Sequence, residues 1–228
     1  MNTAATAPGH SALLYSGGLD SVAAAWLLPH AVPVYVTLGH PYEAAELRTA
    51  RQLAPHLHVL AGPPVGRLQE PDGHIRHRNA LLVTVAAAHG YRTIYMGAVR
   101  GEASPDKSPA FFRRMTQLLA TSEAERHAVQ APFAHLTKSQ LLRQALAAGM
   151  PHQRALASRS CYSPAGACGQ CQACFRRWVA LVHAGLPAGP RPATPPANAW
   201  RHLRRAGVRR WWDVAVNNME ALWARLKA

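Results

Sequence analysis

The fold follows from one short stretch near the start of the chain, Leu13-Leu14-Tyr15-Ser16-Gly17-Gly18-Leu19-Asp20-Ser21. Its apolar beginning predicts a buried strand over 13–15, and the residues after it predict a helix over about 21–28. The paired glycines between them allow a tight turn that brings backbone N–H groups close to an anion. The start of the helix adds its partial positive charge. Strand, glycine turn and helix together predict a phosphate-binding loop.

Each polar side chain of this loop has a chemical use. The Ser16 and Ser21 hydroxyls can donate to phosphate oxygens, and Asp20 can cap the helix or help to hold Mg²⁺. A plain strand-to-helix turn is the alternative interpretation. No Gly-Lys-Ser/Thr follows, so this is not a Walker loop. The hexapeptide resembles the PP-loop of ATP pyrophosphatases, which cleave ATP between the α and β phosphates to form an adenylate. The predicted ATP-contacting residues are Tyr15, Ser16, Gly17, Gly18, Leu19, Asp20 and Ser21.

Beyond the loop, short β-rich runs alternate with longer amphipathic runs through the first 150 residues. This alternation predicts an α/β fold with a doubly wound parallel sheet, in which ligands bind at the carboxyl ends of the strands. Gly97, at the end of the fourth expected strand, therefore joins the predicted nucleotide site. The further strands are expected over 34–38, 58–60, 93–96 and 129–131, and the helices over 44–53, 80–88, 111–120 and 175–182, with another opening at Thr137 as N-cap.

The chain divides into four expected parts. Residues 1–150 form the nucleotide-binding domain, and 151–185 a cysteine-bearing segment with a helix. Residues 186–197 contain five prolines and predict a linker. The tail, 198–228, combines arginines with four of the six tryptophans. Such a tail could contact RNA or another protein, although an amphipathic helix that docks on its own domain or on a second subunit is the favoured interpretation.

The composition indicates which classes of partner and which cellular location to expect. The chain has 25 Lys and Arg residues against 11 Asp and Glu, a formal charge of +14. This excess favours anionic partners, including nucleic acid, but a GC-rich genome also enriches arginine. A run of about 18 apolar residues, as a membrane span needs, does not occur. The N-terminus does not resemble a secretory signal, so we expect a cytoplasmic protein without a membrane partner.

All four cysteines lie close together, as Cys161, Cys168, Cys171 and Cys174. Clustered cysteines without a secretion signal indicate metal ligation rather than disulfides. Four soft thiolates with no vacant position suit a tetrahedral structural Zn²⁺. An iron–sulfur cluster and redox-active thiols are the alternatives. We expect the metal to hold the C-terminal segment against the sheet domain, in a mainly structural role.

Phosphate loop and cysteine cluster together give a more specific signal than either gives alone. Over roughly residues 11–185 the chain resembles the 7-cyano-7-deazaguanine synthase family of queuosine-precursor synthesis. The matching stretches are Leu14 to Ser21, Arg78-Asn79-Ala80-Leu81, Pro132 with Leu136-Thr137-Lys138, and Ser160-Cys161-Tyr162 with Cys168-Gly169-Gln170-Cys171-Gln172-Ala173-Cys174.

The resemblance implies an ATP-dependent ligase. In this family, ATP activates the carboxylate of 7-carboxy-7-deazaguanine as an adenylate, and ammonia then gives an amide. A second ATP-driven dehydration gives the nitrile. The implied cofactors are Mg²⁺ with ATP, and Zn²⁺, and the implied assembly is a homodimer.

Roles for individual residues follow by position from the same resemblance. Arg78 and Asn79 would contact nucleotide or substrate, and Lys138 would lie near the phosphates and complete a catalytic set with Ser16, Asp20 and Ser21. The alternatives are that Asn79 only caps a helix and that Arg78 and Lys138 are solvated.

Two segments depart from the family pattern. Residues 103–108 read Ala-Ser-Pro-Asp-Lys-Ser where the family has Tyr-Pro-Asp-Cys-Arg, and residues 39–43 read Gly-His-Pro-Tyr-Glu where it has Tyr-Gly-Gln-Arg-His. Asp106 survives as a candidate for binding a guanine-like edge, or else serves a turn. The altered substrate half leaves open a paralogue that stops at the amide or couples the activated deazaguanine to another amine.

Two further hypotheses remain from the sequence. A tRNA-modifying PP-loop enzyme would suit the basic charge, and salt-sensitive tRNA binding would distinguish it. A nucleotide-binding subunit without catalysis is the non-enzymatic alternative. The presence of Ser16, Asp20 and Ser21 argues against this last hypothesis.

Overall fold

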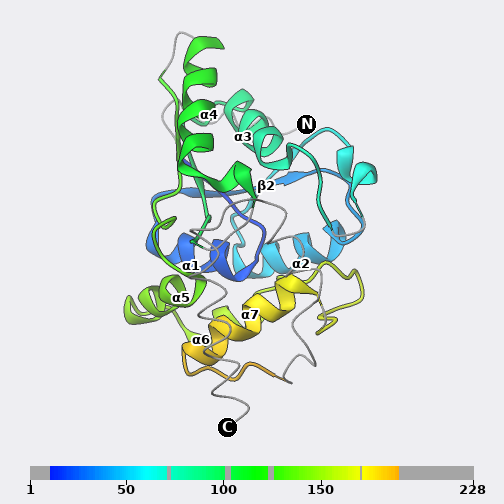
Figure 1. Ribbon diagram of the computed structural model, residues 1–228, viewed down its shortest axis with the longest axis vertical. Coiled ribbons are helices and arrows are strands. Elements are labelled where there is room, and N and C mark those ends of the chain that lie inside the picture. Colours follow the sequence, from blue (N-terminus) through cyan, green and yellow to red (C-terminus); the bar gives the residue numbers. More distant parts are fainter. Residues whose placement is uncertain (1–10, 71–72, 101–103, 123–125, 170, 190–228) are drawn as a thin grey trace.

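The computed structural model describes residues 11–70, 73–100, 104–122, 126–169 and 171–189. Within these ranges a five-stranded parallel sheet has the order β3-β2-β1-β4-β5. The phosphate-loop strand, β1, is therefore central, and the sheet is covered by helices on both faces (Figure 1). The strands are β1 (Ser11–Leu14), β2 (Val32–Thr37), β3 (His58–Ala61), β4 (Thr93–Met96) and β5 (Ala128–Gln130).

Two apolar cores lie on opposite faces of this sheet. One contains Leu13 and Tyr35 with α1, α2, α5 and α7, and the other contains Ala12 and Val34 with α3 and α4. Alternate residues of a strand point to opposite faces, so each face of the sheet has a core of its own. The helices are α1 (Leu19–Leu27), α2 (Glu43–Leu53), α3 (Arg78–Ala88), α4 (Pro109–Ser122), α5 (Lys138–Ala147), α6 (His152–Ala157) and α7 (Gln172–His183), with short 3₁₀ turns η1 (Val65–Leu68) and η2 (Pro105–Lys107).

This architecture confirms the predicted α/β fold with a parallel sheet. Thr137 is the N-cap of α5, where its side chain accepts from the Gln140 backbone N–H and the Gln140 side chain returns a bond to the Thr137 N–H. The one described α-helix that the sequence analysis missed is α6, because six residues are too few to show a helical apolar period.

The strand order has one switch point, between β1 and β4, and the expected ligand crevice lies beyond the carboxyl ends of these two strands. From β1 the chain continues to β2 and β3 on one side of the sheet. The neighbour of β1 on the other side is β4, which is followed by β5. In parallel sheets such a switch point is where ligands bind, beyond the carboxyl ends of the strands. The phosphate loop follows β1 and Gly97 follows β4, so both predicted nucleotide-binding segments border this crevice. A β-carbon on Gly97 would lie 3.4 Å from the Ser21 backbone nitrogen, which places it against the first turn of α1.

The segment after β5 returns to the phosphate-loop side of the sheet. Helices α5 and α7 share the core of α1, and Leu141, Leu142 and Leu181 are fully buried there. Arg177 on α7 donates to the Leu156 carbonyl oxygen at 2.7 Å and so caps the end of α6. The cysteine-bearing segment is therefore packed directly against the nucleotide half.

Several expectations lie outside the described residues. They concern the tail at 198–228, most of the linker at 186–197 and Ala103. The division into four parts stays a prediction. Within the described ranges, no helix combines the length and the apolar character that crossing a membrane would need.

Gly17 is the position where the fold most needs a glycine. Its φ is +71° and a β-carbon would approach the Ala50 nitrogen on α2 to 2.9 Å. At Gly149, with φ +89°, no neighbouring atom of the described residues would lie within 4 Å of such a β-carbon. We expect Gly149→Ala to lower the free energy of unfolding by about 1 kcal/mol, from the left-handed backbone alone. Gly17→Ala should cost about 3 kcal/mol, because a steric clash is added. Denaturant titration measures both, and equal losses would contradict the close packing of the loop on α2.

Candidate active site and metal centre

The phosphate loop is organised by its own serines. Ser16 Oγ accepts from the Gly18 backbone N–H at 3.2 Å, and Ser21 Oγ donates to the Gly18 carbonyl oxygen at 3.0 Å. The two hydroxyl oxygens lie 3.5 Å apart. Gly18 is the N-cap of α1 and brings no capping side chain. Both predicted serines therefore contact the same turn at the start of α1.

Asp20 and Lys138 meet across the mouth of this loop. Their side chains form an ion pair, with exposed fractions of only 18% and 14%, although they are 118 positions apart in the chain. Lys138 is thus held at the loop rather than solvated, and Asp20 pairs with it rather than capping α1. The second carboxylate oxygen of Asp20, Oδ1, is buried and has no hydrogen-bond partner among the described residues. A buried carboxylate oxygen of this kind fits a Mg²⁺ ion carried by a nucleotide.

Arg78 is the first residue of α3, which packs on the face of the sheet opposite α1. Burial, the largest effect, lowers the pKa of its guanidinium, but the nearby Tyr42, Tyr162, Glu46 and Asp106 side chains raise it on balance. The guanidinium is therefore partly buried and permanently charged beside aromatic rings and carboxylates. Such a group suits a planar, anionic substituent of a ligand.

Asn79 and Asp106 lie next to this arginine. Asn79 is buried, and its Nδ2 donates to the Asp106 carbonyl oxygen at 3.4 Å. It does not cap α3, because His77, with φ +57°, is the N-cap. The Asp106 carboxylate accepts from the hydroxyl of Ser104, the N-cap residue of η2. The structure therefore gives Asp106 the turn contact that the sequence suggested and also places it near Arg78.

The segment that departs from the family pattern, 39–43, lines the same region. The rings of His40 and Tyr42 lie 4.0 Å apart between centroids, and Tyr42 and Tyr162 lie 5.5 Å apart. Glu46 Oε2 accepts from the Tyr35 hydroxyl at 2.8 Å and lies 3.4 Å from His40 Nε2. Tyr42 is buried, whereas Tyr162 is 39% exposed. Sequence reasoning did not assign these aromatic residues to the site, because the partners come from segments far apart in the chain.

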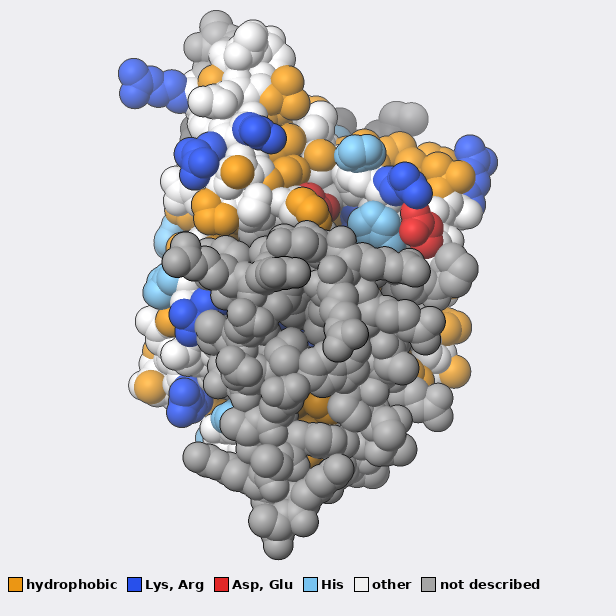
Figure 2. Space-filling view, in the orientation of Figure 1, with side chains coloured by type: hydrophobic (Ala, Val, Ile, Leu, Met, Phe, Trp, Pro, Cys, Tyr) orange, Lys and Arg blue, Asp and Glu red, His pale blue; other side chains and the backbone are white. Residues whose placement is uncertain are grey.

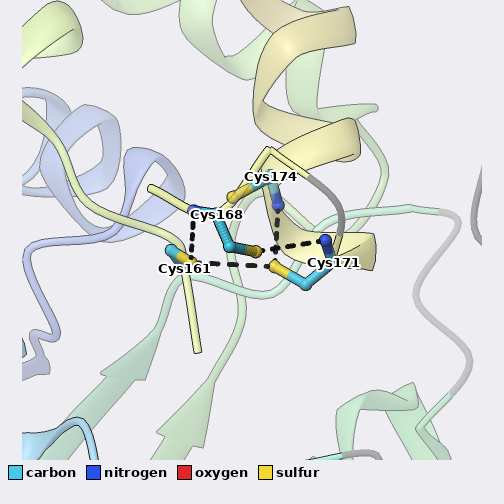
Figure 3. A group of neighbouring side chains, drawn as sticks. All are labelled: Cys161, Cys168, Cys171 and Cys174. Carbon is cyan, nitrogen blue, oxygen red and sulfur yellow. Dashed lines mark hydrogen bonds between the residues drawn. The ribbon is translucent and has the colours of Figure 1, made fainter. Parts of the chain in front are cut away.

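The four cysteines converge at the start of α7. Their Sγ atoms all lie within 4.8 Å of one another, and Figure 3 shows them pointing into one space. Backbone N–H groups face the sulfurs: those of Ser163 and Cys168 lie 3.3 and 3.2 Å from Cys161 Sγ. Such N–H groups stabilise thiolates, and tetrahedral zinc with sulfur at about 2.3 Å fits sulfurs at this separation. Burial raises the pKa of the Cys171 and Cys174 thiols, so a cation is needed to hold them as thiolates.

The described basic side chains on one face of the molecule do not form a single patch. On the face in Figure 2, the described Lys and Arg side chains are scattered over the upper and left parts rather than gathered in one patch. A nucleic-acid surface normally shows a continuous basic stripe. The described part of this face therefore gives no support to nucleic-acid binding.

Comparison with known proteins identifies the family. The sequence model of the queuosine biosynthesis protein QueC matches residues 66–185, which is just over half of the chain. This chain belongs to the QueC family. The matched range contains Arg78, Asn79, Asp106, Lys138 and the four cysteines, whereas the phosphate loop precedes it.

Curated relatives of this QueC-family chain carry the name 7-cyano-7-deazaguanine synthase. One from Anaeromyxobacter sp. (strain Fw109-5) is 32% identical over 130 residues, which is 51% of this chain and 54% of that protein. Others, from Hahella chejuensis and Methanosphaerula palustris, are both 27% identical over 76% of this chain, and over 89% and 94% of their own lengths. The predicted resemblance is thus confirmed at the level of the family.

The cysteine cluster predicts the metal content of the purified chain. We expect about one zinc ion per chain by elemental analysis, without visible absorption bands. Cys161→Ser should lose most of it, because Cys161 is the buried ligand, whereas Ser163→Ala should keep it. Iron with inorganic sulfide in the wild-type protein would contradict the zinc assignment.

Proposed function

We propose that this chain is an AMP-forming C–N ligase that converts 7-carboxy-7-deazaguanine and ammonia to 7-cyano-7-deazaguanine with ATP. The observation that carries the proposal is the Asp20–Lys138 pair on the phosphate loop. It joins the predicted PP-loop to a lysine inside the range that matches the QueC family. The names of the relatives supply the product, 7-cyano-7-deazaguanine.

The phosphate loop would bind the pyrophosphate end of ATP. The backbone turn at Gly17 and Gly18, with the Ser16 and Ser21 hydroxyls, would donate to phosphate oxygens. Lys138 would neutralise charge that develops on the leaving pyrophosphate. Asp20, with its buried Oδ1, would hold the Mg²⁺ that accompanies the nucleotide.

The opposite side of the crevice would bind the deazaguanine. Arg78 would orient the carboxylate, Asp106 would accept from the guanine-like edge, and the exposed ring of Tyr162 would contact the heterocycle face. This arrangement would bring the substrate carboxylate toward the phosphate loop.

The reaction would proceed through two activations. A carboxylate oxygen attacks the α-phosphorus, the bond to the bridging oxygen breaks, and pyrophosphate leaves. Ammonia then attacks the acyl carbon, loses a proton and displaces AMP to give the amide. In the second round the amide oxygen attacks the α-phosphorus and pyrophosphate leaves, and the adenylated amide then loses two protons from nitrogen and AMP to give the nitrile. Each adenylation turns a poor leaving group into AMP and releases pyrophosphate. Both rounds would therefore use the same phosphate loop.

The sequence differences from the family pattern at residues 39–43 favour a second candidate function. His40 and Tyr42 replace the family residues and pack toward Tyr162 and Arg78, so the substrate side has its own shape. A paralogue that stops at the amide, or that couples the activated deazaguanine to another amine, would use such a site. Homodimerisation and an acceptor bound by the basic tail belong to the same proposal as expectations.

Product analysis tests the proposal directly. We expect AMP, pyrophosphate and the 7-cyano product by mass spectrometry after the zinc-loaded chain is incubated with Mg²⁺-ATP, 7-carboxy-7-deazaguanine and ammonium. Amide alone would support the paralogue. No ATP-dependent product would exclude the substrate assignment, with tRNA tried next, and no pyrophosphate with any acceptor would support a binding subunit.

Lys138 gives the sharpest test of the phosphate loop. Lys138→Met should lower kcat by about 10²- to 10³-fold, because it removes a charge aimed at the leaving pyrophosphate. Arg143→Met is the matched control, since Arg143 is exposed on the same helix and the charge change is equal. Similar kcat values for both variants would exclude a catalytic role for Lys138.

Arg78 tests the substrate side in the same way. Arg78→Lys keeps the charge but loses the planar fork, so KM for the deazaguanine should rise about 10- to 100-fold while nucleotide affinity stays unchanged. Arg76→Lys is the control, because the Arg76 side chain is 80% exposed and pairs with Glu70. A rise in the Kd for the nucleotide without a change in the KM for the deazaguanine would instead assign Arg78 to ATP binding.

A further inference from the structure

The residues just before the first cysteine lie on the phosphate loop. The Arg159 backbone N–H donates to the Gly17 carbonyl oxygen at 2.9 Å. The Leu19 N–H, at the start of α1, points to Ser160 Oγ at 3.5 Å. A β-carbon on Gly18 would meet the Arg159 carbonyl oxygen at 3.5 Å and Ser160 Oγ at 3.8 Å. The segment 159–160 is therefore one wall of the loop that is expected to hold the phosphates.

The same segment is fixed at its other end by the cysteine cluster. Cys161 follows Ser160 directly and is 5% exposed. The chain turns back around it, since its Sγ accepts from the Ser163 and Cys168 backbone N–H groups and the Arg159 guanidinium donates to the Ser163 carbonyl oxygen. A metal at the four sulfurs would lock this turn, and with it the position of Arg159 and Ser160.

Helix α7, by contrast, has other attachments to the body of the protein. Ala180 and Leu181 are fully buried in the core of α1 and α5, and Arg177 donates to the Leu156 carbonyl oxygen. The helix is therefore docked by apolar packing and by this cap. A metal at the four sulfurs would therefore order mainly the segment that carries Arg159, Ser160 and Cys161 rather than α7.

We propose that Ser160 is a nucleotide-site residue, held on the phosphate loop by the metal at the cysteine cluster, so that metal loading sets nucleotide affinity. A serine hydroxyl can accept and donate at the same time. Ser160 Oγ accepts from Leu19 N–H, so its own O–H can donate to a phosphate oxygen at the start of α1. The inference rests on the proposed ATP site and adds a residue and a metal dependence to it.

Metal removal gives the first test. The zinc-loaded and the chelator-treated full-length chain are titrated with Mg²⁺ and α,β-methylene-ATP, and amide hydrogen exchange is followed at residues 16–19. We expect Kd to rise about tenfold without metal, the effect of ordering one further backbone residue on binding. The loop amides should exchange faster while those of β4 do not change. Unchanged Kd and unchanged loop exchange would overturn the coupling.

A matched pair of variants tests Ser160 itself in the zinc-loaded chain. Ser160→Thr and Ser160→Val have almost the same shape and differ in the hydroxyl. We expect the valine variant to bind the nucleotide analogue about 2- to 12-fold more weakly than the threonine variant, which is the worth of one hydrogen bond. Ser163→Ala is the control: Ser163 also lies close to Cys161 in sequence, two residues after it, and its hydroxyl accepts from the Ala165 backbone N–H.

The outcomes separate this inference from the proposed function. Equal nucleotide affinity in the threonine and valine variants would overturn the role of Ser160, even if the metal-free chain should unfold. Failure of the zinc-loaded wild type to bind the analogue would instead exclude the proposed ATP site. In that case, faster amide exchange at residues 16–19 on metal removal would still support the coupling between the metal and the order of the phosphate loop. Unchanged exchange would overturn that coupling.

Discussion

The site depends on the close backbone packing around Gly17. Its carbonyl oxygen accepts from Arg159 N–H at 2.9 Å, and on its other side there is no room for a side chain, because a β-carbon would approach the Ala50 nitrogen to 2.9 Å. Two segments that are distant in sequence thus fix one tight turn. This turn leads directly into α1, and the start of a helix is where an anion can bind.

The ionic arrangement follows from this packing. Because α5 lies against α1 in the same core, Lys138 at the start of α5 reaches Asp20 in the first turn of α1. Both side chains are mostly buried, so the pair is screened little by water and its geometry is defined by the two helices. A lysine on a free loop would have no such constraint. The capping box at Thr137 supports the arrangement, since it determines where α5 begins.

The opposite half of the crevice is where this chain differs from the pattern of its family. Tyr42 packs between His40 and Tyr162, and Arg78 is partly buried beside them. An aromatic side chain at position 42 therefore affects the site through contact with neighbours that match the family. Under the proposed function, a phosphate loop that resembles the family beside different packing at the proposed substrate side would suit a change of acceptor within one reaction class.

The sequence by itself determined the elements and the chemistry: the glycine turn between a strand and a helix, the strand–helix alternation, and four cysteines at metal-binding spacing. These are local features, set by backbone freedom, apolar periodicity and ligand type. Only the tertiary structure decided which distant residues meet. It paired Asp20 with Lys138 and brought Tyr42 to Tyr162 and Arg159 to Gly17. Such contacts depend on strand order and helix packing, which join segments that no local pattern connects.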